Sequence, residues 1–217
     1  MKSLIKIGLI LGGTFASTFL LSQVFDVITF ANIRQVLYNI QHQPDLIVGI
    51  VVTTLLFLDI FIAVPTMTII LLSGYFLGFT NSLVFVFVGL FAAAITGYFI
   101  SLKWGEKLLR FIEKDFESQQ KMKKLFHQHG STMLIISRAM PILPEVTACL
   151  AGICKMPFRR FIFSWLMGTI PYAFIAAYSG SISDLNNPSP AIFGAILISG
   201  CLWVAWYYFI KRNNIKV

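Results

Sequence analysis

Three charged residues lie inside long apolar segments of the sequence: Asp59, Arg138 and Glu145. A charged side chain in hydrocarbon costs about 2.5–3.5 kcal/mol on insertion scales, so such residues normally pair or line a polar pathway. An arginine can hold a phosphate group through two hydrogen bonds at once. A carboxyl group removed from water can carry a proton near neutral pH. We therefore predict that these residues bind an anionic head group and couple its movement to protons.

The same residues also have simpler interpretations. Arg138 can pair with a carboxylate to hold two segments together, since buried ion pairs are often architectural. Asp59 can lie at a membrane interface. Two prolines, Pro141 and Pro144, stand between Arg138 and Glu145. This clustering favours a functional site over an ordinary helix kink.

Proline and glycine interrupt both apolar segments that carry these charges. Pro65 and Gly74 interrupt the first segment, and Pro141, Pro144 and Gly152 interrupt the second. We interpret them as hairpin breaks and as points of close packing between helices. Non-helical backbone at membrane depth is tolerated only where it is buried in protein or faces water. The breaks therefore predict a cavity.

The composition excludes a soluble globular protein. The chain has 217 residues, of which 57% are hydrophobic and 12% are charged, about half the ~25% of an ordinary soluble domain. The segments 60–102, 161–183 and 185–210 contain no Asp, Glu, Lys or Arg, and each exceeds the roughly 18 residues of a membrane span. The net charge of +8 fits basic cytoplasmic loops better than a nucleic-acid partner.

We predict an all-α polytopic membrane protein with an inverted repeat. Its predicted parts are an N-terminal transmembrane helix (the uncharged run 7–25) and external segment at 1–45, a core at 46–190, and a C-terminal transmembrane helix with a basic tail at 191–217. The core is predicted to contain a re-entrant hairpin at 46–80 that ends in a turn at 78–82, a span at 83–102, an amphipathic cytoplasmic helix at 103–129, a second hairpin at 130–156 and a span at 158–180.

The charge pattern predicts which segments share one side of the membrane. Basic residues concentrate near the N-terminus, in 103–129, around Lys155 and at the C-terminus, so these segments should be cytoplasmic. The two hairpins must then enter from opposite faces. An offset of 78 residues relates Gly74 to Gly152. Inverted repeats of broken helices are typical of transporters, whose substrate sites lie between the repeats.

The motif Ser-Arg-Ala-Met-Pro-Ile-Leu-Pro at 137–144, followed by Ala-Gly at 151–152 and Met-Pro-Phe at 156–158, resembles the DedA/VTT-domain membrane proteins, in particular their SNARE-associated Golgi-protein branch. Pro65 and the segment 73–78 (Ser-Gly-Tyr-Phe-Leu-Gly) resemble the family too. The similarity covers 46–180. It implies two opposed re-entrant hairpins and movement of lipids across a bilayer. In the family this movement is undecaprenyl phosphate recycling or phospholipid scrambling, with proton coupling in some members.

The sequence departs from the DedA pattern at two positions. Pro144 stands where DedA members carry a second arginine, and the segment 65–67 is neutral where they carry an acidic tip. The departures leave the identity of the lipid open. Glu145 is our candidate for the replacement of the missing acid.

The predicted function is that of a lipid flippase or scramblase. It would move phospholipid or polyprenyl-phosphate head groups through a cavity between the hairpins. The alternative is a secondary transporter or channel for a small ion or solute, with a closed aqueous pathway. An enzyme is not expected, because the embedded segments contain no histidine and no nucleophile–base pair at mechanistic spacing. We expect no metal, no cofactor and no nucleic acid. The expected partners are membrane lipids and protons, with a homo-oligomer left open. The expected location is a bacterial inner (plasma) membrane, with both termini cytoplasmic.

Overall fold

The computed structural model describes residues 12–13, 17, 30–62, 64–112, 116–139, 143–183 and 189–212. Every regular element in this part of the chain is a helix, which confirms the all-α prediction. In chain order the helices are α2 (Phe30–Asn39), α3 (Asp45–Leu58), α4 (Thr66–Ile112), α5 (Phe116–Ile136), the short 3-10 helix η1 (Ser137–Ala139), α6 (Leu143–Ile153), α7 (Phe158–Ser181) and α8 (Ser189–Arg212). Apart from 12, 13 and 17, the predicted first span at 7–25 lies outside the described residues.

Among the residues that the structure describes, two stretches are long and apolar enough to cross a membrane by length and composition: Thr66–Lys107, within α4, and Phe158–Ser181, which is α7. Large apolar side chains also face outward from the helices. Phe163 of α7 is 67% exposed, and Phe193 of α8 is 71% exposed. An apolar outer surface of this kind is typical of a protein that contacts a membrane or another protein.

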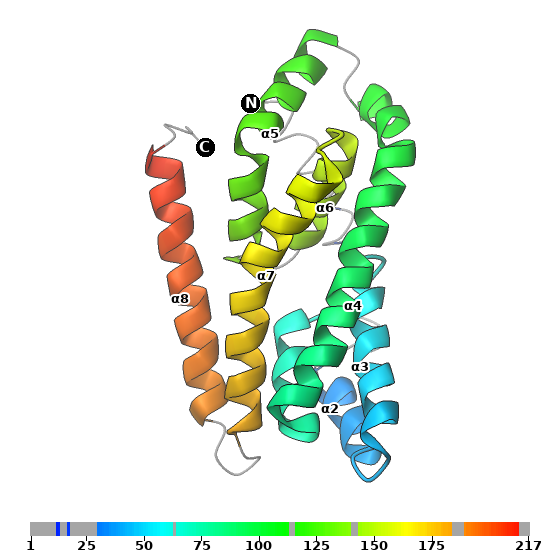
Figure 1. The fold of residues 1–217 in the computed structure, drawn as a ribbon, viewed down its shortest axis with the longest axis vertical. Helices are drawn as coiled ribbons and strands as arrows, with labels where there is room; N and C mark the ends of the chain where they lie inside the picture. The colour runs from blue at the N-terminus through cyan, green and yellow to red at the C-terminus, as the bar shows by residue number, and fades with distance from the viewer. Residues whose placement is uncertain are drawn as a thin grey trace.

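The chain reverses direction within α4. The hydroxyl oxygens of Ser73 and Ser82 lie 2.6 Å apart, although nine residues of straight helix would separate them by about 13.5 Å. The reversal occurs at Gly78, which has φ 72° and ψ 174°, a conformation that glycine adopts without steric cost. This is where the sequence predicts a turn. The short first part of α4 (66–77) therefore lies beside the long second part (79–112) (Figure 1).

The prediction of one amphipathic helix over 103–129 is wrong in its bounds. α4 continues to Ile112, and α5 begins at Phe116. Leu109 of α4 and Phe126 of α5 are each 1% exposed and belong to the same apolar core. The apolar periodicity continues across the break because both helices face that core, so periodicity alone does not reveal where one helix ends.

Glycines allow helices from the two halves of the chain to approach closely. A Cβ atom on Gly74, in the first part of α4, would collide with the carbonyl oxygen of Ala177 in α7. A Cβ atom on Gly152, in α6, would collide with the carbonyl oxygen of Tyr98 in α4. The two glycines are therefore points of close helix packing, the role that the sequence predicts for them.

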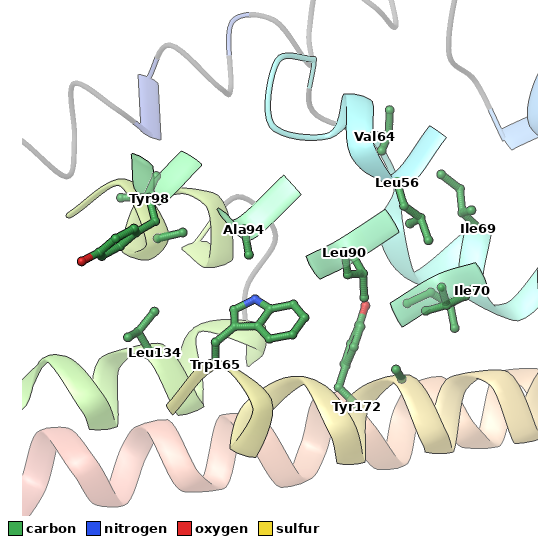
Figure 2. Close-up of a cluster of buried hydrophobic side chains, with 14 of the residues drawn as sticks. Leu56, Val64, Ile69, Ile70, Leu90, Ala94, Tyr98, Leu134, Trp165 and Tyr172 are labelled. Atoms are coloured by element: carbon green, nitrogen blue, oxygen red, sulfur yellow. The ribbon is translucent and has the colours of Figure 1, made fainter. Parts of the chain in front are cut away.

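The apolar core lies between α4 and α7. Figure 2 shows Trp165 and Tyr172 pointing from α7 toward Ala94 and Leu90 of α4. α8 lies along α7 at one edge of the molecule, and α2 and α3 pack against α4 (Figure 1).

Candidate functional site

Asp59 is the first residue of the loop between α3 and α4. We call the described residues of this loop, 59–62 and 64–65, the first tip. Asp59 is only 4% exposed. Its Oδ1 accepts a hydrogen bond from the Val64 N–H at 2.9 Å, and its Oδ2 accepts one from the Thr66 hydroxyl at 2.8 Å. A chain that leaves one helix and enters another has backbone donors without helical partners. Both carboxylate oxygens of Asp59 are thus used to complete the first tip.

Arg138 lies in η1 (Ser137–Ala139), which directly follows α5 and which we call the second tip. Its side chain is held by α7. The Nη2 atom donates a hydrogen bond to the Thr169 hydroxyl at 3.2 Å, and the Cζ atom lies 5.4 Å from the centre of the Tyr172 ring. The ion pairs seen in the described part of the chain involve Glu106, Lys123 and Lys155 but not Arg138. The guanidinium group is therefore positioned by α7 rather than by direct pairing with a carboxylate.

Glu145 lies in the first turn of α6, directly after Pro144. The positive end of a helix dipole lies at this position and favours a carboxylate. The carboxyl groups of Glu145 and Asp59 lie close enough to share a hydrogen bond, and both are within electrostatic range of Arg138. Glu145 therefore brings α6 into contact with the first tip.

The three charged residues line one pocket. Its lining residues are Asp59, Ile60, Leu90, Ala93, Ala94, Arg138, Pro144, Glu145, Ala148 and Trp165. Apolar side chains from α4 form one wall, and Trp165 of α7 belongs to the opposite wall. The enclosed space has a volume of about 20 Å³, room for about one water molecule, whereas ligand pockets usually have volumes of about 300–1,000 Å³. In this conformation the pocket is therefore too small for a head group.

The other predicted site residues have different positions. Pro65 directly precedes α4, and Pro144 lines the pocket. Gly74 and Gly152 lie at helix contacts outside the pocket lining. Pro141 lies outside the described residues.

Sequence reasoning missed the contribution of α7. Trp165, Thr169 and Tyr172 follow one another at spacings of four and three residues, which places them on one face of the helix. A further signal was Pro171, which lies inside α7. A proline in a helix interior removes a backbone hydrogen bond, and here it stands beside the two residues that contact Arg138.

Within the described residues, no group of three or more His, Cys, Asp and Glu side chains is placed to hold a metal ion. The pocket therefore offers one guanidinium group and two carboxyl groups as its charged chemistry.

Comparison with known proteins identifies the family. The VTT domain matches residues 64–182. An uncharacterized membrane protein of Buchnera aphidicola subsp. Schizaphis graminum (strain Sg) is 29% identical over 146 residues, covering 54% of this chain and 56% of the relative. Undecaprenyl phosphate transporter A of Bacillus subtilis (strain 168) is 24% identical over 94 residues, covering 41% of this chain and 48% of the relative. The chain thus matches about half the length of these relatives. No solved structure matches it.

The fold and the pocket define a helical membrane protein with a charged site between two broken helical segments. The chain belongs to the VTT-domain family, also called the DedA family.

Proposed function

We propose that this protein is a lipid flippase or scramblase, which moves the head group of a phospholipid or a polyprenyl phosphate across the membrane through the pocket between the two tips. The observation that carries the proposal is the meeting of Arg138 with Asp59 and Glu145 at one pocket. The Bacillus subtilis relative, named as an undecaprenyl phosphate transporter, gives independent support for a lipid-linked phosphate as cargo.

The lengths of the helices support re-entrant hairpins. α3 has 14 residues and α6 has 11, which correspond to about 21 and 17 Å at 1.5 Å per residue. The first part of α4, residues 66–77, spans about 18 Å by the same measure. Each of these three segments is shorter than a hydrocarbon layer of about 30 Å, whereas α5, with 21 residues, spans about 32 Å. In Figure 1, α3 and α5 approach mid-height from opposite ends of the molecule, as expected for hairpins that enter from opposite faces.

A reciprocal contact supports an inverted repeat. Gly74 of the first half packs on Ala177 of the second, and Gly152 of the second half packs on Tyr98 of the first. If the two halves are related by an offset of 78 residues, residue 74 corresponds to 152 and residue 177 corresponds to 99. The equivalent of the first contact would then join 152 and 99, and the structure shows Gly152 on Tyr98, one residue away. Each hairpin would thus pack on the long helix that follows the other hairpin.

The charge balance of the pocket supports a phosphate cargo that moves with a proton. Two ionised carboxylates and one guanidinium give the pocket a net charge of −1, which repels an anion. One proton on the Asp59–Glu145 pair brings the net charge to zero and lets the phosphate reach Arg138. An arginine can bind phosphate oxygens through a planar pair of N–H donors. The apolar tail of the lipid would stay in the bilayer.

The positions of the helix ends support a location of the basic segments on the cytoplasmic side of the membrane. The end of α4, the start of α5, the start of α7 and the end of α8 all lie at the upper end of the molecule in Figure 1. Lys107, Lys124, Arg159 and Lys211 lie on these segments, and all four are exposed. Positive charge on one side of a membrane protein is typical of its cytoplasmic side. We propose a bacterial inner membrane with the C-terminus in the cytoplasm, and the N-terminus on the same side.

The test is lipid movement in proteoliposomes. Fluorescent phosphatidylglycerol and a fluorescent polyprenyl phosphate are placed in both leaflets, and a membrane-impermeant quencher reports how fast inner-leaflet lipid reaches the outside. We expect the wild type to move at least one of these lipids and Arg138→Ala to move neither. Arg159→Ala is the matched control, because it removes an exposed arginine at the start of α7, away from the pocket. Equal lipid movement by the wild type and the inserted, folded Arg138→Ala variant would refute the site.

The alternative function is transport of a small ion or solute through the same pocket. The guanidinium and carboxyl groups that line the pocket suit such a cargo as well. Absence of movement of every lipid tested, with and without a proton gradient, would favour this alternative over the lipid transporter.

A further inference from the structure

The orientation of the Arg138 side chain depends on α7, although Arg138 itself lies in η1. Arg138 lies on the second tip, but both of its polar contacts named above come from α7. The Thr169 hydroxyl accepts one hydrogen bond from the guanidinium group. The Tyr172 ring lies within the range of about 6 Å at which a cation is attracted to an aromatic face.

Burial makes these contacts effective. Thr169 is 1% exposed and Tyr172 is 9% exposed, so water does not compete freely for either group. A hydrogen bond and a cation–π contact are both stronger where water is excluded. The long, flexible arginine side chain would otherwise have many orientations in the pocket.

The backbone of α7 packs directly on the end of α5, next to the second tip. Gly168 packs on the backbone of α5, where a Cβ atom would lie 2.6 Å from the carbonyl oxygen of Ile135. Ile135 is three residues before Arg138, and Gly168 directly precedes Thr169. The distance between the second tip and the Thr169 hydroxyl is therefore set by a direct backbone contact.

We propose that Thr169 and Tyr172 are positioning residues, which hold the Arg138 guanidinium group at the orientation in which it receives the phosphate of the cargo. This inference rests on the proposed function, since it assigns the cargo phosphate to Arg138. It deepens that function, because it assigns to α7 the control of affinity for the anionic head group.

Two pairs of variants separate positioning from general packing. Thr169→Val removes the hydroxyl at nearly constant shape, whereas Thr169→Ser keeps it. Tyr172→Leu removes the ring, whereas Tyr172→Phe keeps an aromatic face for the cation. Tyr178→Leu is the matched control for ring loss, because Tyr178 lies on the same helix, is 51% exposed and contacts Phe79 rather than Arg138.

The first readout is the dependence of transport rate on the mole fraction of labelled phosphatidylglycerol. Loss of one hydrogen bond of ordinary strength corresponds to about a fivefold change in affinity. We expect Thr169→Val and Tyr172→Leu each to raise the half-saturating fraction by about fivefold, while the maximal rate changes much less. Thr169→Ser and Tyr172→Phe should restore most of the affinity. An equal loss of maximal rate without a change in half-saturation would overturn the inference, since that pattern indicates general damage.

The second readout does not depend on transport. Purified protein in detergent is treated with phenylglyoxal, which modifies arginine, and the modification rate of Arg138 is followed by peptide mass spectrometry. Thr169→Val and Tyr172→Leu should release the guanidinium group and raise this rate several-fold, whereas Thr169→Ser, Tyr172→Phe and Tyr178→Leu should resemble the wild type. The same rate in the wild type and both releasing variants, including no modification in any of them, would refute the positioning role. If the wild type moves no lipid but this labelling pattern is found, the proposed function fails while the positioning of Arg138 stands.

Discussion

Replacement of Asp59 tests how the first tip is held together. Asp59→Ala removes the acceptor of the Val64 N–H and the partner of the Thr66 hydroxyl. The site is 4% exposed, so water cannot replace both bonds. Hydrogen bonds to a charged group contribute about 1.5–3 kcal/mol each. Part of the loss is offset because alanine needs no desolvation, and we expect the free energy of unfolding to fall by about 3 kcal/mol.

Asp59→Asn is the matched control, because it removes the charge and keeps the hydrogen bonds. The amide oxygen can accept from Val64, and the amide nitrogen can donate to the Thr66 hydroxyl oxygen, which has free lone pairs. Asp59→Asn should therefore unfold close to the wild type. Any loss of transport in this variant then reports the role of the charge or proton rather than damage to the fold.

The assay is the melting temperature of the purified protein in detergent, followed by loss of the monodisperse peak in size-exclusion chromatography. For a chain of this size, about 3 kcal/mol corresponds to a fall of roughly 6–12 °C. A melting temperature of Asp59→Ala equal to that of Asp59→Asn would refute the reasoning, because it would show that the two hydrogen bonds do not stabilise the tip.

Three further predictions test the packing, the pocket charge and the upper end of the molecule. Gly152→Ala places a Cβ atom 2.8 Å from the Leu102 nitrogen and should lower the melting temperature by several degrees through overpacking, whereas Gly200→Ala, which meets nothing within 4 Å, should not; equal melting temperatures would contradict the close approach. Wild-type transport of an anionic lipid should accelerate as the pH is lowered and the pocket takes up a proton, and Glu145→Gln should flatten this profile; an unchanged profile would exclude Glu145 as the proton carrier. Glu106→Gln removes partly exposed ion pairs with two lysines, at 3.2 and 3.7 Å, and should change the melting temperature by no more than about 2 °C; a larger loss would show that these pairs hold the helices together.

Much of the architecture can be predicted from the sequence because its signals are local. Uncharged runs mark the long helices, and Gly78 marks the reversal within α4. Asp59, Arg138 and Glu145 can be selected because a charge in an apolar segment needs a partner or a polar surrounding. Each of these inferences uses only the immediate neighbours of a residue in the chain.

The parts that could not be predicted depend on contacts distant in sequence. The division of 103–129 between α4 and α5 is hidden because both helices face one core. Thr169 and Tyr172 are ordinary residues for an apolar helix, and only the position of Arg138, 31 residues before Thr169, gives them significance. The hydrogen bond from Val64 to Asp59 could not be predicted either, because the donor is a backbone N–H, which every residue except proline has.

Asp59 and Arg138 are held in place by different kinds of contact, and we infer from this difference that they have different roles. The offset of 78 residues relates Asp59 to Ser137, the neighbour of Arg138, so an acid and a base stand at nearly equivalent positions. Asp59 is bonded by Val64 of its own tip and by Thr66, the first residue of α4, so it is held by residues that follow it closely in the chain. Arg138 is oriented by α7, so a shift of α7 relative to the second tip would reorient the guanidinium group directly. In the proposed transport cycle, Asp59 therefore provides a fixed side of the pocket, and a change in affinity for the head group arises at Arg138.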